Sequence, residues 1–289
     1  MGRLIPILLF LTSITVVAEL ATEAGVFTLL ATRLARLARL ARGKILWLYV
    51  IVALAASVIT IFLGLDATAV LFTPVVIILA RRVQAPLYPF ILLPLLFSNL
   101  ASLLLPVSNL TNLLSQYKFH LHNSAYLHLS YRSSVAAIAS TIAAGIATFG
   151  ALIRDRSKLR FRLIPFRLLL LVTALFAGVD LLNHYGFGHL LAHATSTTIG
   201  TILWSGLVAN LINNLPAYLI FETAATPHNL LYLLIGVNFG SIILPWGSLA
   251  TLLWAQRCKA AGVKVEWRKT ILISALFAAA VLPLATISI

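Results

Sequence analysis

Two long apolar stretches of this sequence are each interrupted near the middle by the same short polar motif. Asn99-Leu-Ala-Ser-Leu-Leu-Leu-Pro106 recurs as Asn238-Phe-Gly-Ser-Ile-Ile-Leu-Pro245, with Asn, Ser, Leu and Pro in the same register. The hydrocarbon core of a membrane holds no water for a freed backbone group, so such an interruption survives only inside protein or beside a cavity. Interrupted membrane helices at matching places in two halves of a chain are the sequence pattern of a transporter binding site.

The composition places these stretches in a lipid bilayer. The chain has 289 residues, of which 61% are hydrophobic and 10% are charged, and its mean hydropathy is +1.02. Several apolar runs exceed the ~18 residues that suggest a spanning helix. We therefore expect an all-α, polytopic integral membrane protein, with the plasma (inner) membrane as its location.

The basic residues indicate how the chain is oriented. All but three of the 21 Lys and Arg residues fall in four segments, which are 33–44, 81–82, 154–167 and 257–269. The positive-inside rule assigns these segments to the cytoplasm. The net charge of +14 is thus explained by membrane topology, and we expect no nucleic-acid partner.

The sequence also lacks the patterns of an enzyme. It shows no nucleophile–base arrangement, no phosphate-binding loop and no metal motif, so we expect no catalytic residues, no metal and no cofactor. A single cysteine, Cys258, rules out a disulfide within the chain.

The loop charges give the two halves opposite orientations, which predicts two inverted-topology repeats, 1–156 and 157–289. Each repeat is expected to contain a re-entrant hairpin (45–80; 196–223) and a broken transmembrane helix (86–117; 229–256). The hairpin follows from length, because the helix between Asp66 and Arg81 rises only ~21 Å, less than the ~30 Å hydrocarbon core. The remaining predicted helices are a spanning helix (4–20; 163–182), a lateral helix (26–43; 185–195) and a closing helix (131–153; 270–288).

Asn213-Asn-Leu-Pro216 and Pro245-Trp-Gly-Ser-Leu-Ala-Thr-Leu-Leu-Trp254, together with Leu105-Pro-Val-Ser-Asn-Leu-Thr-Asn-Leu-Leu114, resemble the arsenite permease family. That family belongs to a larger ion-transporter group that includes sodium–dicarboxylate symporters. Asp66-Ala-Thr-Ala-Val-Leu-Phe-Thr-Pro74 is similar to the family's first hairpin segment. The resemblance covers nearly the whole chain, although this chain is shorter than usual family members. A homodimer is one assembly that the resemblance leaves open.

Helix ends, amides and hydroxyls at the hairpin tips and breaks would form a binding site near the membrane midplane. Such mixed donors and acceptors suit a neutral oxyacid such as arsenous or antimonous acid, whereas a di- or tricarboxylate would more often call for Lys or Arg in the core. Asp66 is the only carboxylate at a predicted mid-membrane tip, and it is stable there only when protonated or paired. We expect it to exchange the coupling ion, H⁺ or Na⁺. The candidate substrate- and ion-binding residues are Asp66, Thr68, Asn99, Ser102, Ser108, Asn109, Thr111, Asn213, Asn214, Asn238, Ser241, Gly247, Ser248 and Thr251.

The leading prediction from sequence is a secondary transporter that exports a metalloid oxyacid, driven by the proton gradient. Within transport, the alternatives are a carrier of a carboxylate or inorganic anion and a sodium/proton antiporter. An alternative of another class is a non-transporting relative that acts as a membrane partner subunit.

Overall fold

The computed structural model describes residues 20, 23–40, 45–153 and 195–289, and these residues form helices joined by turns and loops. In the first half, an amphipathic helix is followed by a long helix, a helix in three pieces, a broken helix and a long closing helix. Their bounds are α2 Val26–Leu40, α3 Ile45–Leu63, α4 Leu65–Ala67, the π-helix η1 Thr68–Phe72, α5 Thr73–Arg82, α6 Leu87–Leu100, the 3₁₀-helix η2 Pro106–Ser108, α7 Leu110–Lys118 and α8 Asn123–Ile153.

The described part of the second half repeats this order. A pair of helices is followed by a broken helix and a closing helix. Their bounds are α11 Thr198–Ile212, α12 Asn214–Phe221, α13 Leu230–Phe239, the 3₁₀-helix η3 Gly240–Ile242, α14 Leu249–Ala260 and α15 Trp267–Ile287. Below, the first helix pair is α3 with α4, η1 and α5, and the second helix pair is α11 with α12. The first break is 101–109, and the second break is 243–248.

Both helix pairs turn at a residue with positive φ. Gly64 has φ 91° and ψ 165°, and Asn213 has φ 84° and ψ 151°; each stands directly before the returning helix. Glycine adopts this backbone region freely, whereas asparagine is strained in it. The shared geometry makes Gly64 the structural counterpart of Asn213, so Asp66 corresponds to Leu215 and has no polar counterpart in the second half.

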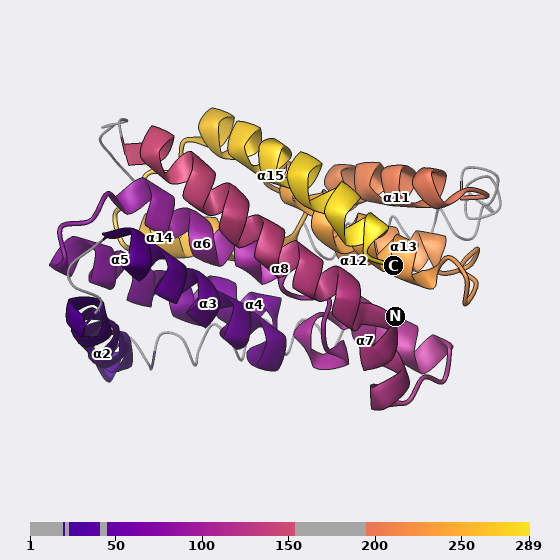
Figure 1. Ribbon diagram of the computed structural model, residues 1–289, viewed down its shortest axis with the longest axis horizontal. Helices are drawn as coiled ribbons and strands as arrows, with labels where there is room; N and C mark the ends of the chain where they lie inside the picture. Colours follow the sequence, from indigo (N-terminus) through magenta and orange to yellow (C-terminus); the bar gives the residue numbers. More distant parts are fainter. Residues whose placement is uncertain (1–19, 21–22, 41–44, 154–194) are drawn as a thin grey trace.

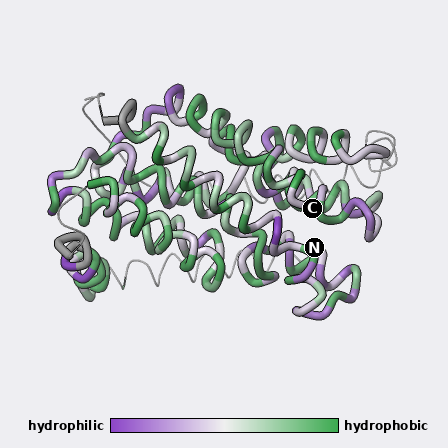
Figure 2. Tube along the Cα trace, viewed as in Figure 1, coloured by the Kyte–Doolittle hydropathy of each residue, from purple (hydrophilic) through white to green (hydrophobic). Residues whose placement is uncertain are grey.

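The described chain contains three helices that are long and apolar enough to cross a membrane, namely α3, α8 and α15. The segments Leu87–Leu100, Thr198–Ile212 and Leu230–Ile242 are apolar but shorter. The closing helices α8 and α15 lie side by side along the bundle. Figure 2 shows hydrophilic colour mainly toward the two ends of the bundle, as expected for a protein that crosses lipid.

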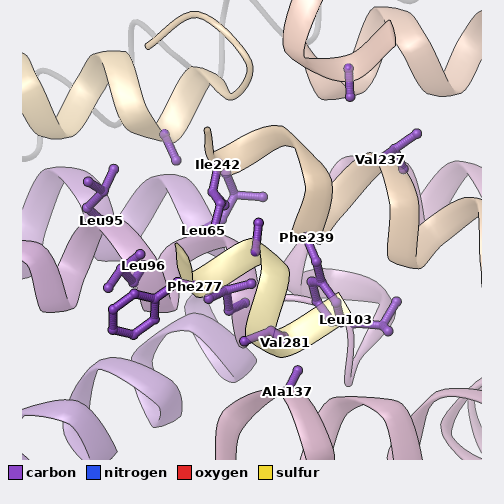
Figure 3. Packing of buried hydrophobic residues seen from close by; sticks show 14 of the residues in the cluster. Leu65, Leu95, Leu96, Leu103, Ala137, Val237, Phe239, Ile242, Phe277 and Val281 are labelled. Atoms are coloured by element: carbon purple, nitrogen blue, oxygen red, sulfur yellow. The ribbon is translucent and has the colours of Figure 1, made fainter. Parts of the chain in front are cut away.

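The two halves share one apolar core. Figure 3 shows Leu65 of α4, Leu96 of α6, Ile242 of η3 and Phe277 of α15 in the same buried cluster. A second cluster belongs to the first half and includes the rings of Tyr49, Phe90 and Phe149, whose centroids lie 4.7–6.2 Å apart. Burial of side chains from both halves fixes the position of each break relative to the other half.

The all-helical class is confirmed, and each predicted segment that the structure describes is helical with the expected interruptions. The closing helix of the first half begins at Asn123, earlier than residue 131, because the polar segment 123–132 is also helical. The spanning helices 4–20 and 163–182, most of the lateral helix 185–195 and the boundary at residue 156 lie outside the described residues. Re-entrance and inverted insertion remain predictions.

Helix α11 packs against α13 and η3 through glycine. A Cβ atom on Gly240 would lie 2.7 Å from Gly206 Cα, and one on Gly236 would meet Ser205 and Ile202. We therefore expect Gly240→Ala to reduce the free energy of unfolding by about 1–3 kcal/mol, because the two backbones must separate. Thermal unfolding in detergent measures the effect. The lipid-facing change Leu207→Ala on α11 serves as the control, since that side chain is half exposed; equal effects of the two changes would contradict the close approach.

Candidate functional site

The first break is held by side chains of its own half. Four successive carbonyl groups are freed where α6 ends, and each accepts a hydrogen bond from α7 or α8. Asn112 Nδ2 donates to Ser102 O at 2.6 Å and to Leu105 O at 3.1 Å, Tyr126 Oη to Leu103 O at 3.2 Å, and Ser130 Oγ to Leu104 O at 3.0 Å. These carbonyl groups have protein partners in place of the water that lipid cannot supply.

The second break is held instead by the second helix pair. Three asparagines near the turn of that pair bond to the broken chain. Asn210 donates through Nδ2 to Gly240 O and accepts from Leu244 N at 2.9 Å, Asn213 Nδ2 donates to Trp246 O at 2.9 Å, and Asn214 N donates to Gly247 O at 2.8 Å. Gly247 is required here, because a Cβ atom would overlap Ser241 O and lie 3.1 Å from Asn210 Oδ1.

The turn of the first helix pair lies against the first break. Ser108 Oγ donates to Ile61 O at 2.7 Å, and a Cβ atom on Gly64 would lie 3.4 Å from Val107 O. Thr68 is buried in the π-helix, where its hydroxyl lies 2.7 Å from that of Thr60. A single π-helical turn often occurs at functional sites, and this one begins two residues after Asp66.

One contact between the halves is fully bonded. Asn238 Oδ1 at the end of α13 accepts from Asn109 Nδ2 at 3.0 Å and from Thr111 Oγ1 at 2.9 Å, and Asn238 Nδ2 donates to Asn112 Oδ1 at 3.0 Å. We call these four residues the bonded junction. Hydrogen bonds between buried amides and hydroxyls stabilise the contact and hold α13 on α7.

The pseudo-equivalent contact is not bonded. By the sequence repeat, Asn99 corresponds to Asn238, Ser248 to Asn109 and Thr251 to Asn112. Among the residues that the structure describes, Asn99 Oδ1, Ser248 Oγ and Thr251 Oγ1 are buried without a hydrogen-bond partner, and the same is true of Asp66 Oδ1. We call Asn99, Ser248 and Thr251 the open junction. Buried polar atoms are nearly always bonded, so such a group of orphaned oxygens needs an explanation.

Other predicted site residues serve the backbone. Ser102 Oγ donates to Asn99 O at 2.7 Å, and Ser241 Oγ donates to Asn238 O at 3.0 Å, each at the end of the preceding helix. Asn214 Oδ1 accepts from Leu215 N at 2.9 Å. These bonds describe structural roles, and whether any of these side chains touches a substrate remains a prediction.

Sequence reasoning left two asparagines out of the site. Asn112 stands in the first motif after the break and ties α7 to both the break and Asn238. Asn210 stands inside the apolar helix α11, four residues after Gly206, and binds the second break. An asparagine that interrupts an apolar helix three residues before a predicted turn was the available signal for Asn210.

The side chains around the turns and breaks suit binding of a small polar solute or ion. They lack the nucleophile and base that covalent catalysis requires. The segments around both turns and both breaks, 60–72, 99–115, 205–217 and 238–254, contain one acid, Asp66, and no Lys, Arg, His or Cys. Within the described chain, no three His, Cys, Asp or Glu side chains group as metal ligands. Amides, hydroxyls and one carboxylate therefore set the polarity of the region.

The chain is similar to known membrane transport proteins. The family model described as citrate transporter matches residues 2–235, more than half of the chain. The chain is also similar to the arsenical pump membrane protein of Escherichia coli, with 22% identity over 343 aligned positions that cover 88% of this chain and 79% of that protein. No solved structure matches.

The chain thus belongs to the citrate transporter family. It is an integral membrane transporter and not an enzyme, and the resemblance to an ion-transporter family with arsenite permeases is confirmed.

The two junctions predict different effects of the same substitution. Asn238→Leu removes the partner of three buried side chains, so we expect it to lower the free energy of unfolding by about 2–4 kcal/mol. Asn99→Leu breaks one 3.2 Å bond to Ser98 Oγ and should cost no more than about 1 kcal/mol. Denaturant unfolding of both variants in detergent micelles compares them. Equal losses would show that the junctions do not differ as described.

Asn213 offers a test of backbone strain. Asn213→Ala loses the bond to Trp246 O and keeps a Cβ atom at positive φ, whereas Asn213→Gly loses the same bond but relieves the strain. We expect the alanine variant to unfold more easily than the glycine variant, by about 1 kcal/mol or more. Melting temperatures of the two purified variants give the comparison, and the reverse order would refute the strained turn.

Proposed function

We propose that this member of the citrate transporter family is a secondary active transporter that exports a neutral metalloid oxyacid, such as arsenous or antimonous acid, at the expense of the proton gradient. The observation that carries the proposal is the polar region between the halves, which is rich in amides and hydroxyls and contains a single acid. Similarity to an arsenical pump membrane protein supports the same class of solute.

The charge of the region supports a neutral solute over an anion. An uncharged trihydroxy acid can donate to amide oxygens and accept from hydroxyl groups without a buried counter-ion. A di- or tricarboxylate brings two or three negative charges, which are costly in a dry interior unless basic groups pair with them. The segments around the turns and breaks supply no lysine or arginine for that purpose.

A carboxylate remains the second candidate substrate, because the family model that matches the chain is described as citrate transporter. Helix N-termini at Asn109 and Ser248 can contribute partial positive charge to such an anion. Citrate flux that saturates, and that arsenite does not inhibit, would favour this candidate.

Asp66 is proposed as the group that takes up and releases the coupling proton. It stands at the turn of the first helix pair with a buried carboxylate oxygen, and burial of a lone ionised carboxylate is costly. Protonation removes this cost and loss of the proton restores it, so the state of Asp66 can bias the transporter between two conformations.

Asp66→Asn tests the coupling. In everted vesicles with an imposed pH gradient, we expect the wild-type chain to accumulate radiolabelled arsenite in preference to citrate, phosphate or sodium. Asp66→Asn should keep the fold and lose the dependence on the gradient, because the amide does not titrate. Glu266→Gln, which removes a carboxylate at the start of α15, is the matched control and should transport normally. Gradient-driven accumulation by Asp66→Asn would discard the role of Asp66, and absence of arsenite flux in the wild type would discard the metalloid.

A further inference from the structure

We propose that Asp66 and the open junction together form a binding site for a hard monovalent cation, Na⁺, to which both halves of the chain contribute. The ligands are the oxygen atoms of Asp66, Asn99, Ser248 and Thr251. The proposal rests on the transport function proposed above, because it names a second ion that shares Asp66 with the proton.

The three elements that carry these residues pack on one another. Helix α4 contacts both α6 and α14, and α6 contacts α14. Leu65, which precedes Asp66, belongs to the same buried cluster as Leu96 and Leu100 on either side of Asn99. Figure 3 shows Leu65 and Leu96 within this cluster. The acid and the open junction therefore occupy one region of the core.

The contact between α5 and α14 fixes how far along the bundle each residue lies. Arg81 Nη2 donates to Ala261 O at 2.8 Å, so the ends of the two helices coincide. Both helices run toward that shared end, at about 1.5 Å per residue. Asp66 precedes Arg81 by about as many residues as the segment just before Ser248 precedes Ala261. Asp66 therefore lies at about the same level along the bundle as the residues just before Ser248.

The contact between α6 and α14 places Asn99 at the same level. The chain turns from α5 into α6 within a few residues of Arg81, so α6 runs away from the shared end and is antiparallel to α14. Trp254 Nε1 donates to Ile91 O at 2.7 Å. Asn99 lies about two turns beyond Ile91, and Ser248 lies nearly two turns before Trp254, so the two residues face the same level.

The charge at this level is negative. The carboxyl end of α6 and the amino end of α14 meet here, and their opposite partial charges of about half a unit largely cancel. The full charge of Asp66 then decides the sign. Helices α3, α4, α6 and the π-helix carry no lysine or arginine, while the basic residues of α14, Arg257 and Lys259, lie in its last turn, at the far end.

The bonded junction shows what the open junction lacks. There, Asn109 and Thr111 donate to Asn238 Oδ1. At the repeat-equivalent positions stand Ser248, whose side chain is shorter, and Ala250, which has no donor. Among the described residues, none forms a hydrogen bond with Asn99 Oδ1, Ser248 Oγ or Thr251 Oγ1. These three oxygen atoms are consequently free to face a ligand. Because the two junctions differ in this way, the open junction presents oxygen atoms without partners where the bonded junction has hydrogen bonds.

The chemistry of the group selects the ligand. A carboxylate, an amide carbonyl and two hydroxyls are hard oxygen ligands, which suit an alkali or alkaline-earth cation and not a soft metal. One carboxylate neutralises one positive charge, so a monovalent ion leaves the buried site uncharged, whereas a divalent ion does not. An anion would meet the oxygens of Asp66 and Asn99. Sodium binding is accompanied by release of the proton from Asp66, so the two ions compete.

Binding of ²²Na⁺ to the purified full-length protein tests the proposal. We expect saturable binding that excess NaCl displaces and excess KCl does not, and that strengthens as the pH is raised. Asp66→Asn should abolish Na⁺ binding. Ser248→Ala and Thr251→Val should each lower the Na⁺ affinity at least ~10-fold, which is the loss seen when a residue that only supports a metal ligand is changed.

The controls are Ser134→Ala and Thr141→Val on α8. Their hydroxyls are equally buried but donate to carbonyls of their own helix, Ser130 O and Ala137 O, at 2.7 and 2.6 Å, so Na⁺ affinity should not change. Protection by sodium against thermal unfolding of the wild type needs no variant and should exceed that by potassium. Absence of saturable Na⁺ binding, or binding that Asp66→Asn, Ser248→Ala and Thr251→Val all retain, would overturn the proposal.

Flux measured on the same preparation separates the two proposals. Proton-driven arsenite transport without sodium binding would refute the cation site and leave the proposed function intact. Sodium binding that depends on Asp66, Ser248 and Thr251, in a protein without metalloid flux, would support the site and refute the proposed substrate.

Discussion

Broken backbone inside a lipid-facing bundle must find every hydrogen-bond partner within the protein, and the rest of this structure depends on how that demand is met. Side-chain amides meet most of it. The Asn112 amide donates hydrogen bonds to backbone carbonyl groups of the first break. The amides of Asn210 and Asn213 donate to backbone carbonyl groups at the second break. An amide can donate and accept at once, so one asparagine can join an interrupted helix to its neighbour without introducing a charge that lipid would oppose.

The two breaks are supported by different neighbours. Donors from α7 and α8, in the same half of the chain, hold the first break, and the turn of α11 and α12 holds the second. In addition, Asn238 fixes α13 on α7, and glycines let α11 approach α13 closely. The polar region is thus built on packed helices and not on free loops, which is the arrangement that holds ligand-binding groups in place.

Much of this architecture could be predicted from the sequence, because lipid imposes simple rules. Apolar length and loop charge predicted the helices, and the repeated motif predicted both interruptions and the equivalence of Asn99 with Asn238. The sequence could not reveal that these two residues differ in bonding. That difference depends on whether the opposing helix presents Asn109 and Thr111 or Ser248 and Ala250, and therefore on three-dimensional register. For the same reason the π-helical turn after Asp66 and the correspondence of Gly64 with Asn213 appear only in the structure, and Asn210 gives little signal within an apolar helix.

The unequal junctions require two halves that differ in sequence. In a two-fold dimer of the first half, Asn99 of each copy would face Asn109, Thr111 and Asn112 of the other, and both contacts would be hydrogen-bonded. In a two-fold dimer of the second half, Asn238 of each copy would face Ser248, Ala250 and Thr251 of the other, and neither contact would be hydrogen-bonded. Only two halves that differ in sequence, joined in one polypeptide, give one contact that is hydrogen-bonded and one whose oxygen atoms are left for a ligand.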